Sequence, residues 1–309
     1  MRTSSGTWRY SFGMKLNETA DFANADLSAD PARMPNWQAR LVLGFADDAG
    51  TTRLIERTHF GPLRVQKPLY PEGAQVCHAI VVHPPGGVVG GDTLAISAKV
   101  GDAAHAFITT PGAAKWYKAN GRISRQDISL EIAAGARLEW LPQETIFFDA
   151  AQVDLTQSVS LAKDASYIAC EIYCFGRTAS GESFNSGTVS QRTSIRREGK
   201  LIWWEQGALA GGSAAMRSPL GLSGKTVCAT LIAAGKPLPA AVLNTIRHQV
   251  GILAGNAADF GISQLKSALV ARYLGDSSET ARAVMLCVWQ HVRPELMACA
   301  AVVPRIWNT

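Results

Sequence analysis

Three glutamates stand alone among apolar residues, where a carboxylate could meet a cation. Glu171 lies in the apolar run 168–175, Glu205 follows two tryptophans, and Glu144 precedes Thr145. Burial of an unpaired carboxylate is costly and raises its pKa, so an arginine, a water-filled passage or a metal ion must offset it. On an alternating strand the same acid would face solvent. We expect burial for Glu171, because both faces of its run are apolar. For Glu205, burial and a solvent-facing position both stay open.

A fourth acid ends an unusual turn. The segment 83–92 places two prolines, four glycines and one carboxylate in ten residues. Glycines permit positive φ and close backbone approach, and prolines fix φ and remove donors. We therefore expect a rigid turn with Asp92 at the start of an alternating strand, where its carboxylate meets a ligand or partner, or caps the turn. The turn residues are His83, Pro84, Pro85, Gly86, Gly87, Gly90 and Gly91.

Other catalytic or binding motifs are missing from the sequence. The glycine segment lacks both Lys-Ser/Thr and the G-x-G-x-x-G pattern, so we do not expect a nucleotide site. No Cys-x-x-Cys, H-E-x-x-H or G-x-S-x-G motif occurs. His78 and His83 are five residues apart, which puts them on opposite faces of a regular strand. We expect neither a fixed metal cage nor nucleophilic catalysis. Arg177 and Glu182 frame a tight turn, across which they could pair.

Composition narrows the class of protein. The chain has 309 residues, of which 47% are hydrophobic and 18% charged, with a net charge of +5. This length allows one large β domain or two smaller domains. Basic residues are dispersed, and no apolar run approaches the ~20 residues that span a bilayer, so we expect no nucleic-acid or membrane partner. Most cysteines sit in apolar runs, which fits a reducing, cytoplasmic location.

The chain divides into a polar leader and a patterned remainder. We expect residues 1–35 to be a disordered extension, with Met34 as an alternative start, and residues 36–309 to form a β-rich domain that includes C-terminal helices. From Trp37 to about Gln206 the apolar period is mostly two, which predicts an antiparallel-rich β architecture.

A faint internal repeat runs through this region. A strand, a small turn and a second apolar strand recur, and the turns end at Ala104, Ala136 and Ala165. A spacing of about 30 residues is typical of stacked repeat units, although hairpins of a β-sandwich could mimic it.

Helical periodicity is confined to the last third of the chain. Residues 239–253 and 278–297 are predicted to be helices, with a strand or two between them at 261–274. Asp276 and Glu279 resemble a capping box for the second helix, and Pro294 should kink or end it.

Five ordered motifs carry a family resemblance. HPPGGVVGGD (83–92), TTPGAAKWY (109–117), LEWLPQETIFF (138–148), FGRTASGESF (175–184) and PRIW (304–307) occur in this order. Together they resemble the urease accessory protein family UreD, called UreH in some organisms. The resemblance runs from about Trp37 to Thr309, and the leader has no counterpart in this pattern.

The resemblance implies a scaffold for assembly of the urease nickel centre, without enzymatic activity. It implies an elongated, solenoid-like, mainly β fold of stacked layers with two helices near the C-terminus. The implied partners are apo-urease, the helical protein UreF, the GTPase UreG recruited through UreF, and indirectly UreE. No tightly bound cofactor is implied, only transient Ni²⁺.

The family is also thought to pass nickel through an internal tunnel, which would give the lone acids a shared role. A conduit needs weak oxygen ligands that admit an ion and release it. The candidate nickel ligands are Asp92, Glu171 and Glu205, then Glu144 and Glu182.

Aromatic residues near the C-terminus are candidates for docking the helical partner. The candidate docking residues are Trp289, Trp307 and the nearby Arg305. Two alternatives from other classes stay open. A metal-dependent β-solenoid hydrolase would need paired carboxylates in an open cleft. An adaptor would make no metal contact.

Overall fold

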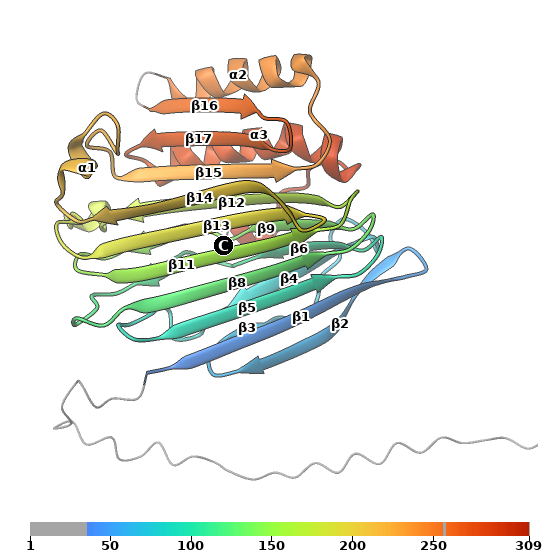
Figure 1. The fold of residues 1–309 in the computed structure, drawn as a ribbon, viewed down its shortest axis with the longest axis horizontal. Helices are drawn as coiled ribbons and strands as arrows, with labels where there is room; N and C mark the ends of the chain where they lie inside the picture. The colour runs from blue at the N-terminus through green and yellow to red at the C-terminus, as the bar shows by residue number, and fades with distance from the viewer. Residues whose placement is uncertain (1–35, 256–257, 309) are drawn as a thin grey trace, which may run out of the picture. The chain divides into compact units, whose positions relative to one another are not determined.

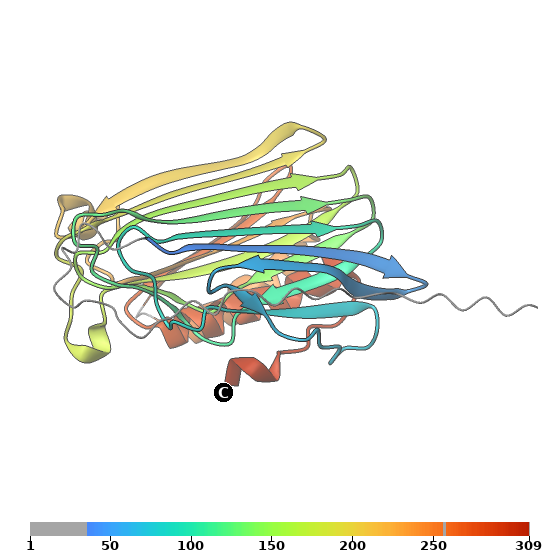
Figure 2. The same cartoon turned by 90° about the horizontal axis from the view of Figure 1, so that it is seen from below.

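The structure is a computed structural model that describes residues 36–255 and 258–308. These residues form two facing β-sheets, with helices packed on the outer side of one sheet (Figures 1 and 2). The predicted mainly β, solenoid-like class with two helices near the C-terminus is confirmed. The leader 1–35, predicted to be a disordered extension, lies outside the described residues.

The first sheet of the described region has seven strands in the order β14-β13-β11-β8-β5-β1-β2. Parallel pairing joins β1 to β5, β5 to β8, β8 to β11 and β11 to β13, and the two edge pairs are antiparallel. The strands are β1 (Gln38–Asp48), β2 (Thr51–Phe60), β5 (Thr93–Val100), β8 (Ser124–Ile132), β11 (Gln152–Leu161), β13 (Thr188–Arg197) and β14 (Lys200–Ala210).

The second sheet follows the order β16-β17-β15-β12-β9-β6-β4-β3, and β10 pairs with both β12 and β7. Here β4, β6, β9 and β12 are parallel neighbours. The strands are β3 (Arg64–Val65), β4 (Val76–Val82), β6 (His105–Thr109), β7 (Ala114–Trp116), β9 (Arg137–Leu141), β10 (Thr145–Phe147), β12 (Ser166–Phe175), β15 (Val227–Ala234), β16 (Asp259–Gln264) and β17 (Leu269–Gly275).

The prediction of an antiparallel-rich architecture is wrong for the centre of both sheets, where neighbouring strands are parallel. Alternation of apolar residues reports which face of a strand is buried. It carries no information about the direction of the neighbouring strand, which depends on the connection between them.

The predicted internal repeat is confirmed as the stacking unit of the fold. After β5, β8 and β11 the chain makes a short turn ending at Ala104, Ala136 or Ala165 and continues in the second sheet as β6, β9 or β12. Neighbouring turns are hydrogen-bonded, since the amide of Ala103 donates to the carbonyl of Ala134 (3.0 Å). Each repeat therefore contributes one strand to each sheet.

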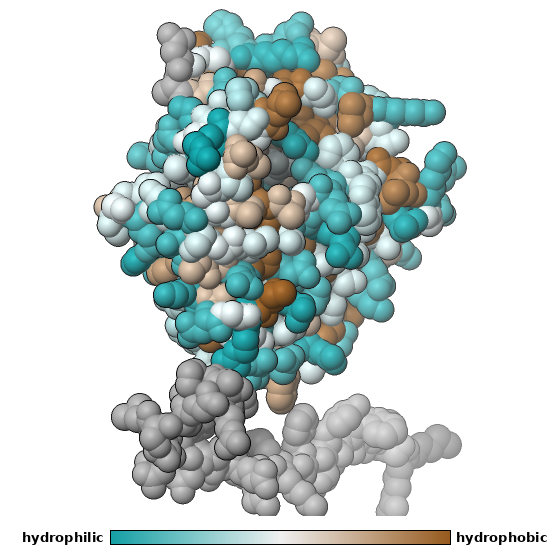
Figure 3. All heavy atoms as spheres, turned by 60° about the vertical axis from the view of Figure 1, so that its left-hand side comes forward, coloured by the Kyte–Doolittle hydropathy of each residue, from teal (hydrophilic) through white to brown (hydrophobic). Residues whose placement is uncertain are grey.

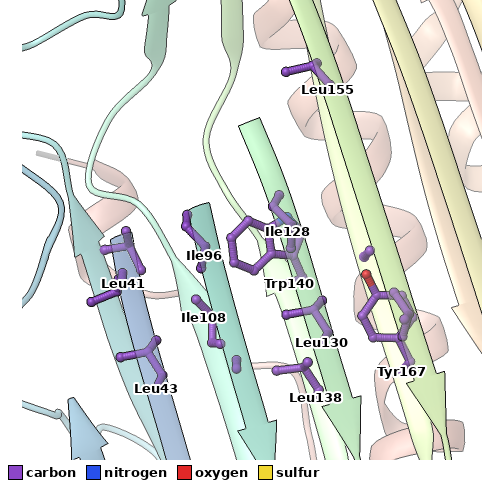
Figure 4. Packing of buried hydrophobic residues seen from close by; sticks show 14 of the residues in the cluster. Leu41, Leu43, Ile96, Ile108, Ile128, Leu130, Leu138, Trp140, Leu155 and Tyr167 are labelled. Atoms are coloured by element: carbon purple, nitrogen blue, oxygen red, sulfur yellow. The ribbon is translucent and has the colours of Figure 1, made fainter. Parts of the chain in front are cut away.

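Two hydrophobic cores result, one on each face of the second sheet. The first lies between the sheets, where Ile96 and Ile128 of one sheet face Leu138 and Trp140 of the other (Figure 4). The second lies between the second sheet and the helices. Burial of these apolar side chains drives both layers together.

The two longer helices of the described region, α2 (Ala240–Ala254) and α3 (Ser278–Met297), agree with the predicted ranges. The short helix α1 (Ala214–Arg217) and the 3₁₀ turns η2 (Thr178–Ser180) and η3 (Arg305–Asn308) were not predicted. The predicted strands between α2 and α3 are confirmed as β16 and β17. None of the helices in the described part of the chain has the length and apolar character needed to cross a bilayer.

The start of α3 differs from the predicted signal. Ser277 is the N-cap, and its hydroxyl accepts the amide hydrogen of Thr280 (3.1 Å). Asp276 instead accepts a hydrogen bond from Lys225 Nζ (2.9 Å), so the predicted capping box is wrong. The helix continues past Pro294 to Met297 rather than ending there.

Candidate functional site

Three adjoining cavities lie between the two sheets. A loop-side cavity of about 240 Å³ is lined by His83 and the following glycines, and a mouth cavity of about 440 Å³ is lined by Glu205 and Arg272. A narrow cavity of about 20 Å³ shares lining residues with both. In the described part of the chain, Glu171 is the one residue that lines all three. We call this set the inter-sheet cavities.

Glu171 projects from β12 into the space where these cavities meet. Its Oε1 accepts a hydrogen bond from the indole Nε1 of Trp140 on β9 (2.8 Å). Burial raises the pKa of the Glu171 carboxyl to about 7, and the Trp140 bond offsets only part of this effect. The side chain keeps some accessible surface because it faces the cavities, although protein surrounds it. Within the described residues, no Lys, Arg or His pairs with it. The expected burial of Glu171 is confirmed only in part, because the residue is half-buried.

The mouth cavity is bordered by an ion pair between the sheets. Glu205 on β14 accepts a hydrogen bond at Oε1 from Arg272 on β17 (2.7 Å). Its other oxygen, Oε2, is buried and has no hydrogen-bond partner among the described residues. Burial, followed by the Glu205 charge, raises the pKa of the nearby Cys228 thiol to about 12. The lining of the mouth cavity therefore offers a cation carboxylate oxygen rather than thiolate at neutral pH.

The glycine-rich turn forms the wall of the loop-side cavity. Gly86 has φ of +79°, and a Cβ at Gly90 would lie 2.0 Å from the carbonyl oxygen of Ala119. The turn is fastened to β7, because the Val88 amide donates to the carbonyl of Lys115 (2.8 Å). Positive φ explains the glycine at position 86, and close backbone approach explains the glycine at position 90.

Asp92 caps this turn and precedes β5, as predicted. Its Oδ1 accepts the amide hydrogen of Trp37 (3.0 Å), and its Oδ2 accepts that of Val89 (3.1 Å). The carboxylate does not line the inter-sheet cavities, whereas His83 does. Burial lowers the pKa of the His83 imidazole, and the nearby Asp92 charge opposes that shift. Asp92 therefore shapes the wall that His83 forms.

Comparison with known proteins identifies the family. The model of the UreD urease accessory protein family matches residues 38–308. The chain belongs to this family. It is 61% identical over 295 residues to a urease accessory protein UreD from Janthinobacterium sp. (strain Marseille), which covers 96% of this chain and 99% of that protein. It is 58% identical to the UreD of Nitrosospira multiformis, over 88% of this chain and 98% of that protein. The Janthinobacterium match is longer than residues 36–309, so it reaches into the leader.

Two further acids of this UreD-family chain lie outside the inter-sheet cavities. Glu144 is buried and forms a two-pronged ion pair with Arg282 of α3, in which Nε donates to Oε1 (2.9 Å). Glu182 pairs with Arg177, whose Nε lies 2.8 Å from Oε2, and this confirms the predicted pairing. The Arg177 hydrogen bond is the main cause of the lowered pKa of Glu182. Both carboxylates thus have a cationic partner.

The C-terminal residues proposed for partner docking differ in exposure. Trp289 is 2% exposed and donates from Nε1 to Glu139 Oε2 (2.7 Å), so it is not a surface anchor. Trp307 is half-buried and donates to the Thr109 hydroxyl (2.8 Å), which fastens the C-terminus to β6. Arg305 is exposed. Figure 3 shows one face of the molecule, on which apolar residues form separate patches among hydrophilic ones.

A buried ionic network between the second sheet and α3 escaped the sequence analysis. The guanidinium of Arg293 donates from Nε to Glu139 (3.0 Å) and from both terminal nitrogens to Glu72 (2.5 and 3.0 Å). His78 and His105 bond to these two carboxylates at 2.6 and 2.9 Å. A charge on the apolar stripe of α3 and a glutamate between Leu138 and Trp140 were the available signals.

Across residues 36–255 and 258–308, no three His, Cys, Asp or Glu side chains come close enough to hold a metal ion together. His78 within β4 and His83 directly after it lie on different sides of the second sheet. His78 stacks on Phe107 with ring centroids 4.3 Å apart, while His83 faces the inter-sheet cavities. This confirms the predicted placement of the two histidines on opposite faces.

Proposed function

We propose that this UreD-family chain is a non-enzymatic scaffold for assembly of the urease nickel centre, and that Ni²⁺ crosses it between the two sheets. Family membership supports the link to urease. One observation supports the path: Glu171 lines all three adjoining cavities and is not paired with a cationic side chain of the described residues.

The chemistry of the path fits transport better than storage. Carboxylate oxygens hold a divalent ion less tightly than thiolates or clustered imidazoles. A carboxyl with a pKa of about 7 can exchange its proton for a cation near neutral pH. Glu205 offers the second oxygen site, and the raised pKa of Cys228 keeps its thiol protonated. Asp92 contributes by fixing the loop wall.

A conduit requires a donor at one end and an acceptor at the other. We propose apo-urease as the acceptor and UreF as the docked partner, with the GTPase UreG recruited through UreF and UreE acting indirectly. The assembly would work in the cytoplasm. Arg305 is the exposed candidate for a partner contact. Trp307 supports it by holding the C-terminal turn on the second sheet.

The path is tested by Glu171→Gln and Glu205→Gln, co-expressed with urease and the other accessory proteins under limiting nickel. The matched control is Glu131→Gln, an exposed acid that pairs with Lys99. We expect urease from the Glu171 variant to contain several-fold less nickel, with the complex still recovered in pull-downs. Normal nickel content in both variants would contradict the path, and loss of the complex would make these acids structural.

The two alternatives make different predictions. A hydrolase needs two free carboxylates that converge on a substrate. Glu205 is instead paired with Arg272, and Glu171 bonds to Trp140. An adaptor without metal contact predicts no Ni²⁺ binding by the isolated chain in a calorimetric titration.

A further inference from the structure

The narrow cavity is lined by amide side chains from three successive strands of the first sheet. Gln126 comes from β8, Gln157 from β11 and Gln191 from β13, with Thr193 beside them. Glu171 faces them from the second sheet and, among the described residues, is the one acid that lines this cavity. Arg192 also borders it, but this residue is exposed. We call the three glutamines the amide belt.

Strand register explains how the belt forms. Leu155 pairs with Gln126 on one side and with Gln191 on the other, whereas Gln157 pairs with Ile128 and Thr193. Each row across the sheet therefore mixes amides with apolar residues, in a sheet whose inward positions are mostly filled by core side chains. Because side chains alternate between faces, all of these residues point toward the second sheet.

Packing alone does not account for the belt. Gln157 is 9% exposed, and its Nε2 has no hydrogen-bond partner among the described residues. Buried polar groups are normally hydrogen-bonded, and leaving one unsatisfied is destabilising. Leucine would fill the same place without this penalty. Because Nε2 is a hydrogen-bond donor, it points to an acceptor such as water in this cavity, so the belt lines a hydrated space.

We propose that the amide belt and Glu171 form a transient binding stop for a partly dehydrated divalent cation in the smallest of the inter-sheet cavities. This rests on the proposed nickel path. A space of about 20 Å³ cannot hold an ion with its full hydration shell. Neutral amide oxygens can replace some of the lost waters, and they add no charge that would trap the ion. The Glu171 carboxylate supplies the charge.

The experiment is a calorimetric titration of the isolated full-length chain with Ni²⁺ alone. The test variants are Gln157→Leu and Gln191→Leu, and the matched control is Gln206→Leu, an exposed amide on the neighbouring strand β14. We expect each test variant to weaken Ni²⁺ binding about tenfold and the control to leave it unchanged. Circular dichroism and urea unfolding verify that the variants fold.

A variant that binds Ni²⁺ more tightly gives a second measurement, which does not depend on whether the fold tolerates leucine at these positions. Gln157→Glu adds a second carboxylate facing Glu171, and we expect it to tighten Ni²⁺ binding about tenfold while slowing urease activation, because release becomes harder. Unchanged Ni²⁺ affinity in the leucine variants and in Gln157→Glu would overturn the proposed cation-binding role of the amide belt.

The failure of the belt and that of the nickel path are distinguishable. If Glu171→Gln lowers the nickel content of urease while the belt variants bind Ni²⁺ normally, the path stands and the belt is wrong. If belt variants lose Ni²⁺ binding but urease is activated normally by both sets, the belt binds a cation and the path is wrong.

Discussion

The two faces of the second sheet treat buried carboxylates in opposite ways. On the helix side, Glu72 and Glu139 are enclosed by Arg293 and two histidines. On the inter-sheet side, Glu171 has one indole bond and faces the cavities. Burial acts on all three carboxyls, yet hydrogen bonds and charges lower the pKa of Glu72 and Glu139, while that of Glu171 rises to about 7. Paired acids hold the fold together, and the acid that has no cationic partner among the described residues is the one that we propose for a ligand.

Removal of the Arg293 guanidinium should destabilise the ionic network on the helix side of the second sheet. Arg293→Met leaves two buried carboxylates without their shared partner, and such a loss typically destabilises by about 3–5 kcal/mol. Urea unfolding at neutral pH measures it. The control is Lys99→Met, since the side chains of Lys99 and its partner Glu131 are 67% and 55% exposed and we expect a change below about 1 kcal/mol. Similar small losses of stability in both variants would contradict the contrast between the two faces of the second sheet.

Glycine replacement in the loop wall is expected to have the next largest effect. A Cβ at Gly90 would lie 2.0 Å from the Ala119 carbonyl oxygen, so backbone must move. We expect Gly90→Ala to destabilise by about 3 kcal/mol, at the upper end for overpacking. Gly207→Ala on β14 is the control, because no atom lies within 4 Å of the place that its methyl group would take. Equal thermal unfolding of both variants would show that the wall is pliable.

Sequence patterns predicted the elements of this fold better than their pairing. The range of α3 follows from its apolar stripe, and the repeat follows from turns ending at Ala104, Ala136 and Ala165. Strand direction was missed, because alternation is the same for parallel and antiparallel neighbours. Burial of Glu171 was predicted from a run that is apolar on both faces.

The site was predictable only where a single segment determines it. The cap formed by Asp92 is local, so its turn was foreseen. The network around Arg293 joins residues up to 221 positions apart, and only the fold brings them together. Likewise, the amide belt needs the register of three strands, which no local pattern specifies.

The pH dependence of stability should separate the two sides of the sheet. The folded-state pKa of Glu171, about 7, lies above the ordinary value of 4.5, so the folded chain binds more protons between these values. Its contribution to stability is therefore complete below about pH 4.5 and is lost as pH rises toward 7. Glu72 and Glu139 behave oppositely, because their contribution is lost as pH falls below the ordinary value.

Glu171→Gln should remove the loss of stability between pH 4.5 and 7 and leave the contributions of Glu72 and Glu139 unchanged. Relative to wild type, we expect the variant to gain on the order of 2 kcal/mol between about pH 5 and pH 8, from the linkage of one pKa shift. Urea unfolding across this range measures the gain. An unchanged slope would mean that Glu171 has a partner that keeps it charged.

The exposed pair between Arg177 and Glu182 should give the smallest effect, and it marks the limit of the comparison. Its side chains are 45% and 20% exposed, so solvent screens their attraction. The amide of Asp149 also donates to Glu182 (2.7 Å), and this bond survives removal of the arginine. We expect Arg177→Ala to destabilise by less than about 1 kcal/mol and to leave urease activation unchanged. Because Glu182 has a cationic partner and lies outside the inter-sheet cavities, a strong loss of activation at normal stability would show that pairing does not exclude an acid from the nickel path.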